Sequence, residues 1–109
     1  MAPDVVRTPV GLVDLAPTFC AIAGIDAPEW MQGRALPQAD APRPSVLTEW
    51  DSALFGVDVH LRTVTTDRWV CSAYRPGTSH DGTEGELYDL VDDPLQQQNR
   101  WDDAGHRAV

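Results

Sequence analysis

Three aspartates near the C-terminal end are the densest group of side chains that could bind a metal ion. Asp89, Asp92 and Asp93 follow one another closely, and carboxylate oxygens are the ligands that hard cations prefer. Their spacing is not that of an EF-hand loop. Helix capping and solvation explain the same carboxylates without a metal, so we expect them to be structural.

Histidines and serines give no clearer catalytic pattern. His60, His80 and His106 are far apart and lack the i and i+4 spacing of paired zinc ligands. The sequence contains no nucleophile elbow of the Gly-x-Ser-x-Gly type. A small acidic enzyme of unrecognised type stays an alternative, but it needs a converging polar pocket that the sequence does not indicate.

The clearest helix is expected from Asp14 to Gly24. Asp14 is a good N-cap residue, and Pro17 falls in the first turn, where its missing N–H costs little. Gly24 can take the left-handed position that ends a helix. The apolar residues of this segment recur at helical spacing and make one face: Leu15, Phe19, Ile22 and Ala23.

Residues 26–44 are rich in proline, which prevents regular structure. We expect an ordered loop that wraps a larger body, with Trp30, Met31 and Leu36 as apolar anchors. The helix and this loop together make the first predicted segment, residues 1–44, the end of a main α/β domain. Residues 45–109 make the second, a C-terminal antiparallel subdomain.

The second segment alternates between strand-forming and loop-forming residues. Extended structure is expected where Val, Thr, Trp and Tyr gather, over residues 45–50, 59–66, 69–74 and 86–90, with a polar loop over residues 51–58. The two middle strands form a hairpin across Asp67-Arg68. Asp93 as cap and Pro94 at the first helical position predict a short helix over residues 94–99.

The composition disfavours two classes of partner. The formal charge is −9, and the eight basic residues are all arginine. Nucleic acids and anionic membranes both require a basic patch, which these scattered arginines do not form. Cys20 and Cys71 are expected to be free buried thiols, as in a reducing cytoplasmic compartment. No signal peptide or apolar run long enough to span a bilayer is present.

Three ordered motifs resemble the C-terminal part of the sulfatase family, within the alkaline-phosphatase-like superfamily. The first motif is Val13 to Thr18, followed by Ala23 to Ile25 and Gln32 to Leu36. The second is Leu61 to Val64, followed by Asp67 to Val70. The third is Glu86 to Leu90, which includes Tyr88, followed by Asp92 to Pro94 and Asn99. Trp69-Val70-Cys71 departs from the aromatic-Lys-aliphatic run of the family. The resemblance implies an α+β fragment of an α/β sandwich, with one core helix, a small antiparallel sheet and a short C-terminal helix.

The resemblance also implies that the catalytic parts lie upstream of this chain. In sulfatases those parts are a Cys/Ser-X-Pro-X-Arg element whose first residue becomes formylglycine, an acidic cluster for a calcium-type cation, and lysine and histidine groups that hold sulfate. We therefore expect no catalytic residue, metal ligand or cofactor here, and a missing N-terminal catalytic region as the partner. The family activity is sulfuric ester hydrolysis, and related proteins cleave phosphate or phosphonate esters.

One pentad imitates the missing nucleophile element. Cys71 and Arg75 have its spacing, but Ala73 stands where the element has proline. The chemistry needs the nucleophile at a helix start beside a metal, whereas this pentad is predicted to lie on a strand. We expect it to be inert.

The loop over residues 51–58 is where such a subdomain could reach an active-site rim. Trp50 and His60, at its two ends, are therefore candidate substrate contacts. The simpler alternative makes Trp50 a core residue and His60 an exposed strand residue. We also expect an ion pair between Glu49 and Arg62 that ties the first strand to the hairpin.

A stand-alone interaction domain is the alternative from another class. Its binding anchors would be the four tryptophans, because aromatic side chains dominate interfaces: Trp30, Trp50, Trp69 and Trp101. The apolar face of the 14–24 helix distinguishes the two hypotheses. That face should lack a partner in a fragment and should pack on the hairpin in a complete small domain.

Overall fold

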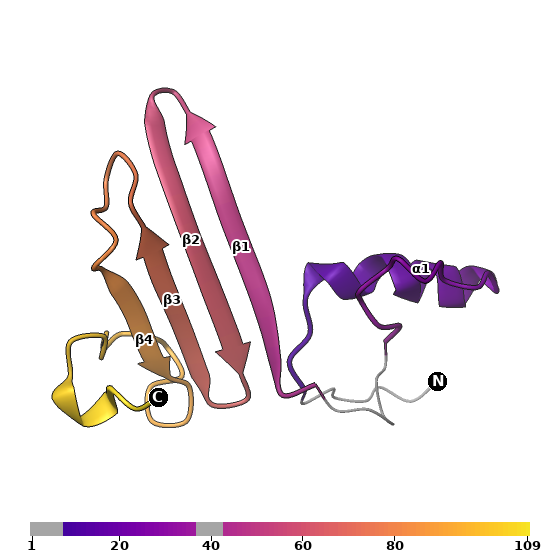
Figure 1. Cartoon of the computed structure of the whole chain (residues 1–109). Coiled ribbons are helices and arrows are strands. Elements are labelled where there is room, and N and C mark those ends of the chain that lie inside the picture. The colour runs from indigo at the N-terminus through magenta and orange to yellow at the C-terminus, as the bar shows by residue number, and fades with distance from the viewer. Residues whose placement is uncertain (1–7, 37–42) are drawn as a thin grey trace. The chain divides into compact units, whose positions relative to one another are not determined.

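The computed structural model describes residues 8–36 and 43–109 (Figure 1). The chain divides into two compact units, Met1–Val46 and Leu47–Val109. The first contains a short 3-10 turn, Leu12–Asp14, and helix α1, Leu15–Ala23. Of the expected proline-rich loop, residues 37–42 lie outside the described part.

Helix α1 forms where the apolar spacing predicts it. Pro17 is buried in its first turn, and Gly24 ends the helix with φ 69°. The amide of Ile25 then donates to the carbonyl of Cys20 at 2.9 Å, closing the helix end as expected.

The capping role predicted for Asp14 is wrong. Residues 12–14 already turn as a 3-10 helix, so Asp14 has a helical backbone and its side chain makes no capping bond to α1. Its carboxylate instead accepts from the amides of Gly11, at 3.0 Å, and Arg34, at 2.9 Å. Arg43 completes the set with a two-pronged ion pair, at 2.9 and 2.7 Å. Asp14 is thus the buried centre that holds the loop against the start of the helix.

The apolar face of α1 is open. Phe19 is 62% and Ile22 78% exposed, although both recur on the face that the pattern assigns to a core. Leu12, just before the helix, is 86% exposed. The hydrophobic effect strongly favours covering such side chains, and the loop of the same unit leaves them exposed.

The remaining elements form one four-stranded sheet in the order β1-β2-β3-β4. Its strands are β1, Ser45–Leu54; β2, Val57–Thr66; β3, Trp69–Arg75; and β4, Gly85–Asp89. The pairs β2–β3 and β3–β4 are antiparallel, and Figure 1 shows β1 and β2 as a long hairpin. A 3-10 turn, Ala104–His106, follows near the end. The small antiparallel sheet with one helix confirms the predicted fold class.

The loop predicted over residues 51–58 is wrong. β1 continues to Leu54, and the chain reverses in two residues, Phe55 and Gly56, with φ of 55° and 79°. Two successive positive φ values suit the twist of a tight hairpin. The polar residues 51 and 52 suggested a loop but occupy positions on a strand, and Phe55 is an unusual turn residue that gives no sequence signal.

The helix predicted over residues 94–99 is also wrong, because the segment is a turn followed by irregular chain in which Gln96 has φ 53°. Asn99 decides this: its side-chain oxygen accepts from the amide of Leu87 at 3.0 Å, and its nitrogen donates to the carbonyl of Gly85 at 3.0 Å. The amide of Arg100 adds a bond to the carbonyl of Leu87 at 2.8 Å. These bonds to β4 replace the internal bonds of a helix, and Asp93 accepts from the amide of Gln98 instead of capping a first turn.

Strand register sets which side chains share a face. His60 pairs with Arg75, and Val64 with Cys71, across β2 and β3. The two-residue turn at Phe55-Gly56 places Glu49 opposite Arg62 and Asp51 opposite His60. Because side chains alternate along a strand, one face carries most of the charges, and we name it the charged face: Glu49, Asp51, His60, Arg62 and Arg75.

Candidate functional site

The charged face is hollowed at its hairpin end by a pocket of about 400 Å³. Asp51, His60, Arg75 and Pro76 line it. Three consecutive strands supply one polar side chain each, and the register alone brings them together. We name this the hairpin pocket.

An aspartate orients the histidine of the hairpin pocket. His60 Nδ1 lies 2.7 Å from Asp51 Oδ1, and the two side chains are 33% and 61% exposed. A neutral His60 that donates from Nδ1 leaves Nε2 as an acceptor, and a protonated ring presents an Nε2–H donor. The pair can therefore hold either a hydroxyl group or an anion.

The loop after Arg75 is tied to β2 by reciprocal hydrogen bonds. Asp58 N donates to Thr78 Oγ1 at 2.9 Å, and Thr78 N donates to Asp58 O at 3.1 Å. His80 stacks on Tyr74, with ring centroids 4.0 Å apart. Burial, followed by the neighbouring Glu86 carboxylate, raises the pKa of Tyr74, so its phenol stays neutral. The Asp58–Thr78 bonds hold the loop that follows Pro76 on β2, whereas Tyr74 and His80 stack on the other face of the sheet.

A second charged pair follows the first along β1 and β2. Arg62 Nε lies 2.6 Å from Glu49 Oε1, and both side chains are about half exposed. The two residues are thus cross-strand neighbours, as the sequence indicated. How much the pair stabilises the sheet stays a prediction, because exposed pairs contribute little on average.

Trp50 and His60, the two candidate rim residues, lie on opposite faces of the sheet. Trp50 precedes Asp51 on β1, so its side chain points away from the hairpin pocket, and it is 57% exposed. The structure brings His60 together with Asp51 and Arg75, which the sequence analysis did not select. Only the position of the tight turn reveals that Asp51 faces His60.

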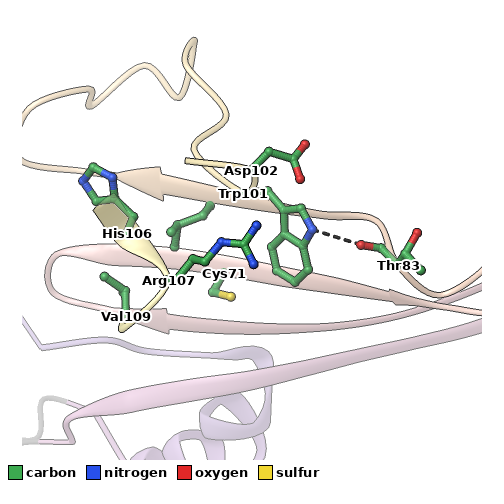
Figure 2. Close-up of a pocket in the computed structure, with 8 residues that line it drawn as sticks. Cys71, Thr83, Trp101, Asp102, His106, Arg107 and Val109 are labelled. Atoms are coloured by element: carbon green, nitrogen blue, oxygen red, sulfur yellow. Dashed lines mark hydrogen bonds between the residues drawn. The ribbon is translucent and has the colours of Figure 1, made fainter. Parts of the chain in front are cut away.

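A second pocket, of about 480 Å³, lies between β3, β4 and the C-terminal segment (Figure 2). Trp101 packs flat on Gly85, where an added Cβ would lie 2.4 Å from the ring. Its indole Nε1 donates to the carbonyl of Thr83 at 3.0 Å. Figure 2 shows Arg107 entering the pocket toward Cys71 and Trp101. Leu87, which is only 5% exposed, also lines this pocket.

The pentad from Cys71 to Arg75 runs along β3 and does not begin a helix. Cys71 and Arg75 share a face but line different pockets. Both Cys71 and Cys20 are free and half-buried. Across residues 8–36 and 43–109, no group of three His, Cys, Asp or Glu residues could hold a metal ion.

The C-terminal aspartates hold the sheet rather than a cation. Asp89 is 2% exposed and accepts from Arg68 Nη2 at 2.7 Å and from the amide of Val91 at 3.0 Å. The hydrogen bonds from Arg68 lower the pKa of Asp89 against the opposing effect of desolvation. Asp92 lies at 3.9 Å from the same guanidinium. Tyr88, beside Asp89 in the resemblance motif, lies on the face opposite the charged face.

Comparisons with known proteins identify the relatives of this chain. It is 32% identical over 98 residues to the uncharacterized sulfatase YidJ of Escherichia coli, covering 90% of this chain and 19% of that protein. It is 31% identical over 110 residues to the Delta 4,5-hexuronate-2-O-sulfatase of Bacteroides thetaiotaomicron, covering 89% and 22%. A solved structure from Bacteroides thetaiotaomicron, described as a sulfatase, matches with TM-score 0.71 and 29% identity, covering 87% of this chain and 21% of that one. No family model matches the chain.

Sequence and fold therefore both relate this chain to sulfatases, which confirms the resemblance carried by the three motifs. The chain spans about a fifth of the length of the curated relatives that it matches. Within the described residues, no helix is both long and apolar enough to cross a membrane.

Proposed function

We propose that this chain is the C-terminal part of a sulfuric ester hydrolase and does not catalyse the reaction by itself. The observation that carries the proposal is the match to sulfatases in sequence and fold over nearly the whole chain, against about a fifth of their length. The parent protein would hold the nucleophile and the cation in the region that this chain does not match.

The chemistry of the described residues supports a catalytic site outside this chain, because these residues do not suit the two cofactors of the family. A formylglycine needs a Cys or Ser at a helix start, whereas Cys71 lies within β3. A calcium-type cation needs several oxygen ligands together, but the described residues offer no such group. The described residues therefore do not fit these groups, and we assign no catalytic step to them.

The partner in this proposal is the N-terminal catalytic region of the same protein. The open face of α1 supports it, because Leu12, Phe19 and Ile22 are all more than half exposed. The free thiols favour a cytoplasmic protein, and the net charge of −9 disfavours nucleic acid and anionic membranes as partners.

The substrate proposed is a sulfated sugar. One matched relative is named as a hexuronate 2-O-sulfatase, so a sulfated acidic sugar is the first compound to test. In this proposal His60 and Trp50 contact the substrate at the rim of the active site, each from its own face of the sheet. Hydrolysis of a phosphate or phosphonate ester, as in related proteins of the same superfamily, is the alternative activity.

The test begins with the coding sequence next to the one for this chain. A Cys/Ser-X-Pro-X-Arg element close to acidic pairs is expected there, in frame or one frameshift away. The joined protein should release sulfate from methylumbelliferyl sulfate faster than phosphate from methylumbelliferyl phosphate, and the 109-residue chain alone should release neither.

Three outcomes would contradict the proposal. An unrelated neighbouring gene would favour a stand-alone binding domain. Preference of the joined protein for the phosphate ester would move the activity to the alternative. Hydrolysis by the 109-residue chain alone, in a preparation free of host sulfatase, would show that a catalytic site lies within it.

A further inference from the structure

We propose that the hairpin pocket binds a carboxylate or sulfate group of the substrate, at a distance from the ester that is cleaved. The inference rests on the proposed function, because it assumes that an anionic sugar reaches the charged face. It adds Arg75 and Asp51 to the residues that recognise substrate and gives His60 a defined role.

Arg75 is a charge without a protein counterion in the described part of the chain. Arg62 and Arg68 each pair with a carboxylate, Glu49 and Asp89 respectively. A guanidinium presents a planar fork of N–H donors that matches a carboxylate or a sulfate. Arg75 is exposed and lines the pocket, so this fork is open to a ligand.

His60 stands directly across from Arg75 in the register of β2 and β3. Two cationic side chains directly opposite each other on antiparallel strands repel. An anion between them removes this repulsion once His60 is protonated. The Asp51 carboxylate, 2.7 Å from His60 Nδ1, holds that edge of the ring and leaves Nε2 pointing away from β1.

The same pocket also suits the hydroxyl groups of a sugar. Asp51 is 61% exposed, so its second oxygen can accept a hydrogen bond. Neutral His60 offers an acceptor at Nε2 when Nδ1 donates to Asp51. A pocket of about 400 Å³ lies within the usual range for small-ligand sites and has room for one sugar ring.

The pocket is largely formed before any ligand binds. Pro76 restricts the backbone next to Arg75, and the hydrogen bonds between Asp58 and Thr78 hold the following loop on β2. Little chain must therefore be ordered on binding, which reduces the entropic cost. The pocket that Arg107 lines differs in its chemistry, because Leu87, Cys71 and Trp101 also line it.

The first experiment measures binding directly and does not depend on catalysis. The isotope-labelled full chain is titrated with glucuronate, inorganic sulfate and glucose, and the NMR signals of His60 and Arg75 are followed. Glucuronate or sulfate should shift both signals, and glucose at the same concentration should not. Arg75→Ala should abolish the shift at His60. Arg107→Ala removes the same charge from the other pocket and should leave the shift intact.

The second experiment uses the joined protein and compares two sulfate esters. Arg75→Ala should lower kcat/KM for a sulfated methylumbelliferyl iduronide about 10- to 100-fold, the usual effect of losing a charge-assisted pair. Its kcat/KM for methylumbelliferyl sulfate, which has no second anionic group, should stay within about twofold of the unmodified protein. Arg75→Lys should recover part of the loss.

The two experiments separate the possible failures. If the joined protein hydrolyses no sulfate ester, the proposed function fails, and the titration still decides whether the pocket binds anions. Equal losses of kcat/KM on both esters would overturn the proposed subsite. It would also be overturned if glucose shifted the His60 and Arg75 signals, or if neither glucuronate nor sulfate shifted them. Loss of the His60 shift in Arg107→Ala would overturn it as well.

Discussion

Replacing Asp14 by asparagine should destabilise the unit that contains α1. The Asp14 side chain is fully buried, and that of Arg43 is 13% exposed. The substitution removes the negative charge and one of the two oxygens that accept from Arg43, at 2.9 and 2.7 Å, and so leaves a nearly buried guanidinium without its counterion. Breaking such a pair by removing one partner costs about 3–5 kcal/mol. We expect the lower end, because Arg43 keeps some access to water.

Hydrogen exchange of the α1 amides measures this loss locally. A cost of about 3 kcal/mol lowers their protection by roughly two orders of magnitude, or to the unprotected rate if the unit is less stable than that. Glu49→Gln is the matched control, because it removes a carboxylate whose ion pair with Arg62 is about half exposed. That change should cost less than about 1 kcal/mol.

Unchanged protection of α1 in Asp14→Asn would refute the reasoning. It would mean that the one hydrogen bond that the single asparagine oxygen can still accept, from the amide of Gly11 or of Arg34, holds the loop without the charge. A loss of equal size in Glu49→Gln would also refute it, since burial would then not distinguish the two pairs.

Three further predictions concern the sheet. Arg68 lowers the pKa of Asp89, so this carboxylate stabilises the fold fully above about pH 4, the pKa of an unfolded aspartate, and its contribution is lost as the pH falls through the lower folded pKa. In Arg68→Gln, the protection of the β4 amides should therefore be lost at a higher pH on acidification. A transition at the same pH as in the unmodified chain would contradict this. Asn99→Ala leaves the amide of Leu87 and the carbonyl of Gly85 without their side-chain partner, so urea unfolding should show a loss of about 1–3 kcal/mol, whereas Gln97→Ala, at an exposed position nearby, should show almost none. Gly85→Ala would place a Cβ 2.4 Å from the Trp101 ring, so the indole signal of Trp101 should shift and stability should fall by about 1–3 kcal/mol; an unshifted indole would show that the ring does not pack on Gly85.

The sequence predicted those elements whose signals are local. Helix α1 follows from apolar spacing and from Gly24, and the β2–β3 hairpin follows from strand-forming residues on both sides of Asp67-Arg68. The helix expected over residues 94–99 failed because its capping signal was weaker than the hydrogen bonds of Asn99 to β4. Those bonds join residues that are distant in the sequence, so no local pattern contains them.

The candidate site illustrates the same limit. His60 was selected from its position, but Asp51 was assigned to a loop and Arg75 to a boundary between elements. The tight turn at Phe55-Gly56 converts that loop into two strands and places Asp51 opposite His60. The same register excludes Trp50 from the pocket, because neighbouring residues of a strand point to opposite faces.

The sequence by itself determined the relationship to sulfatases, the acidic charge, and most of the helix and strand positions, because ordered motifs and local periodicity are written along the chain. Only the tertiary structure decided the partners of Asp14, the pairing of Asp89 with Arg68, and the convergence of Asp51, His60 and Arg75. These depend on strand register and on bonds between distant residues. A shift of one residue in register would move each side chain to the other face, and the sequence pattern alone does not fix that shift.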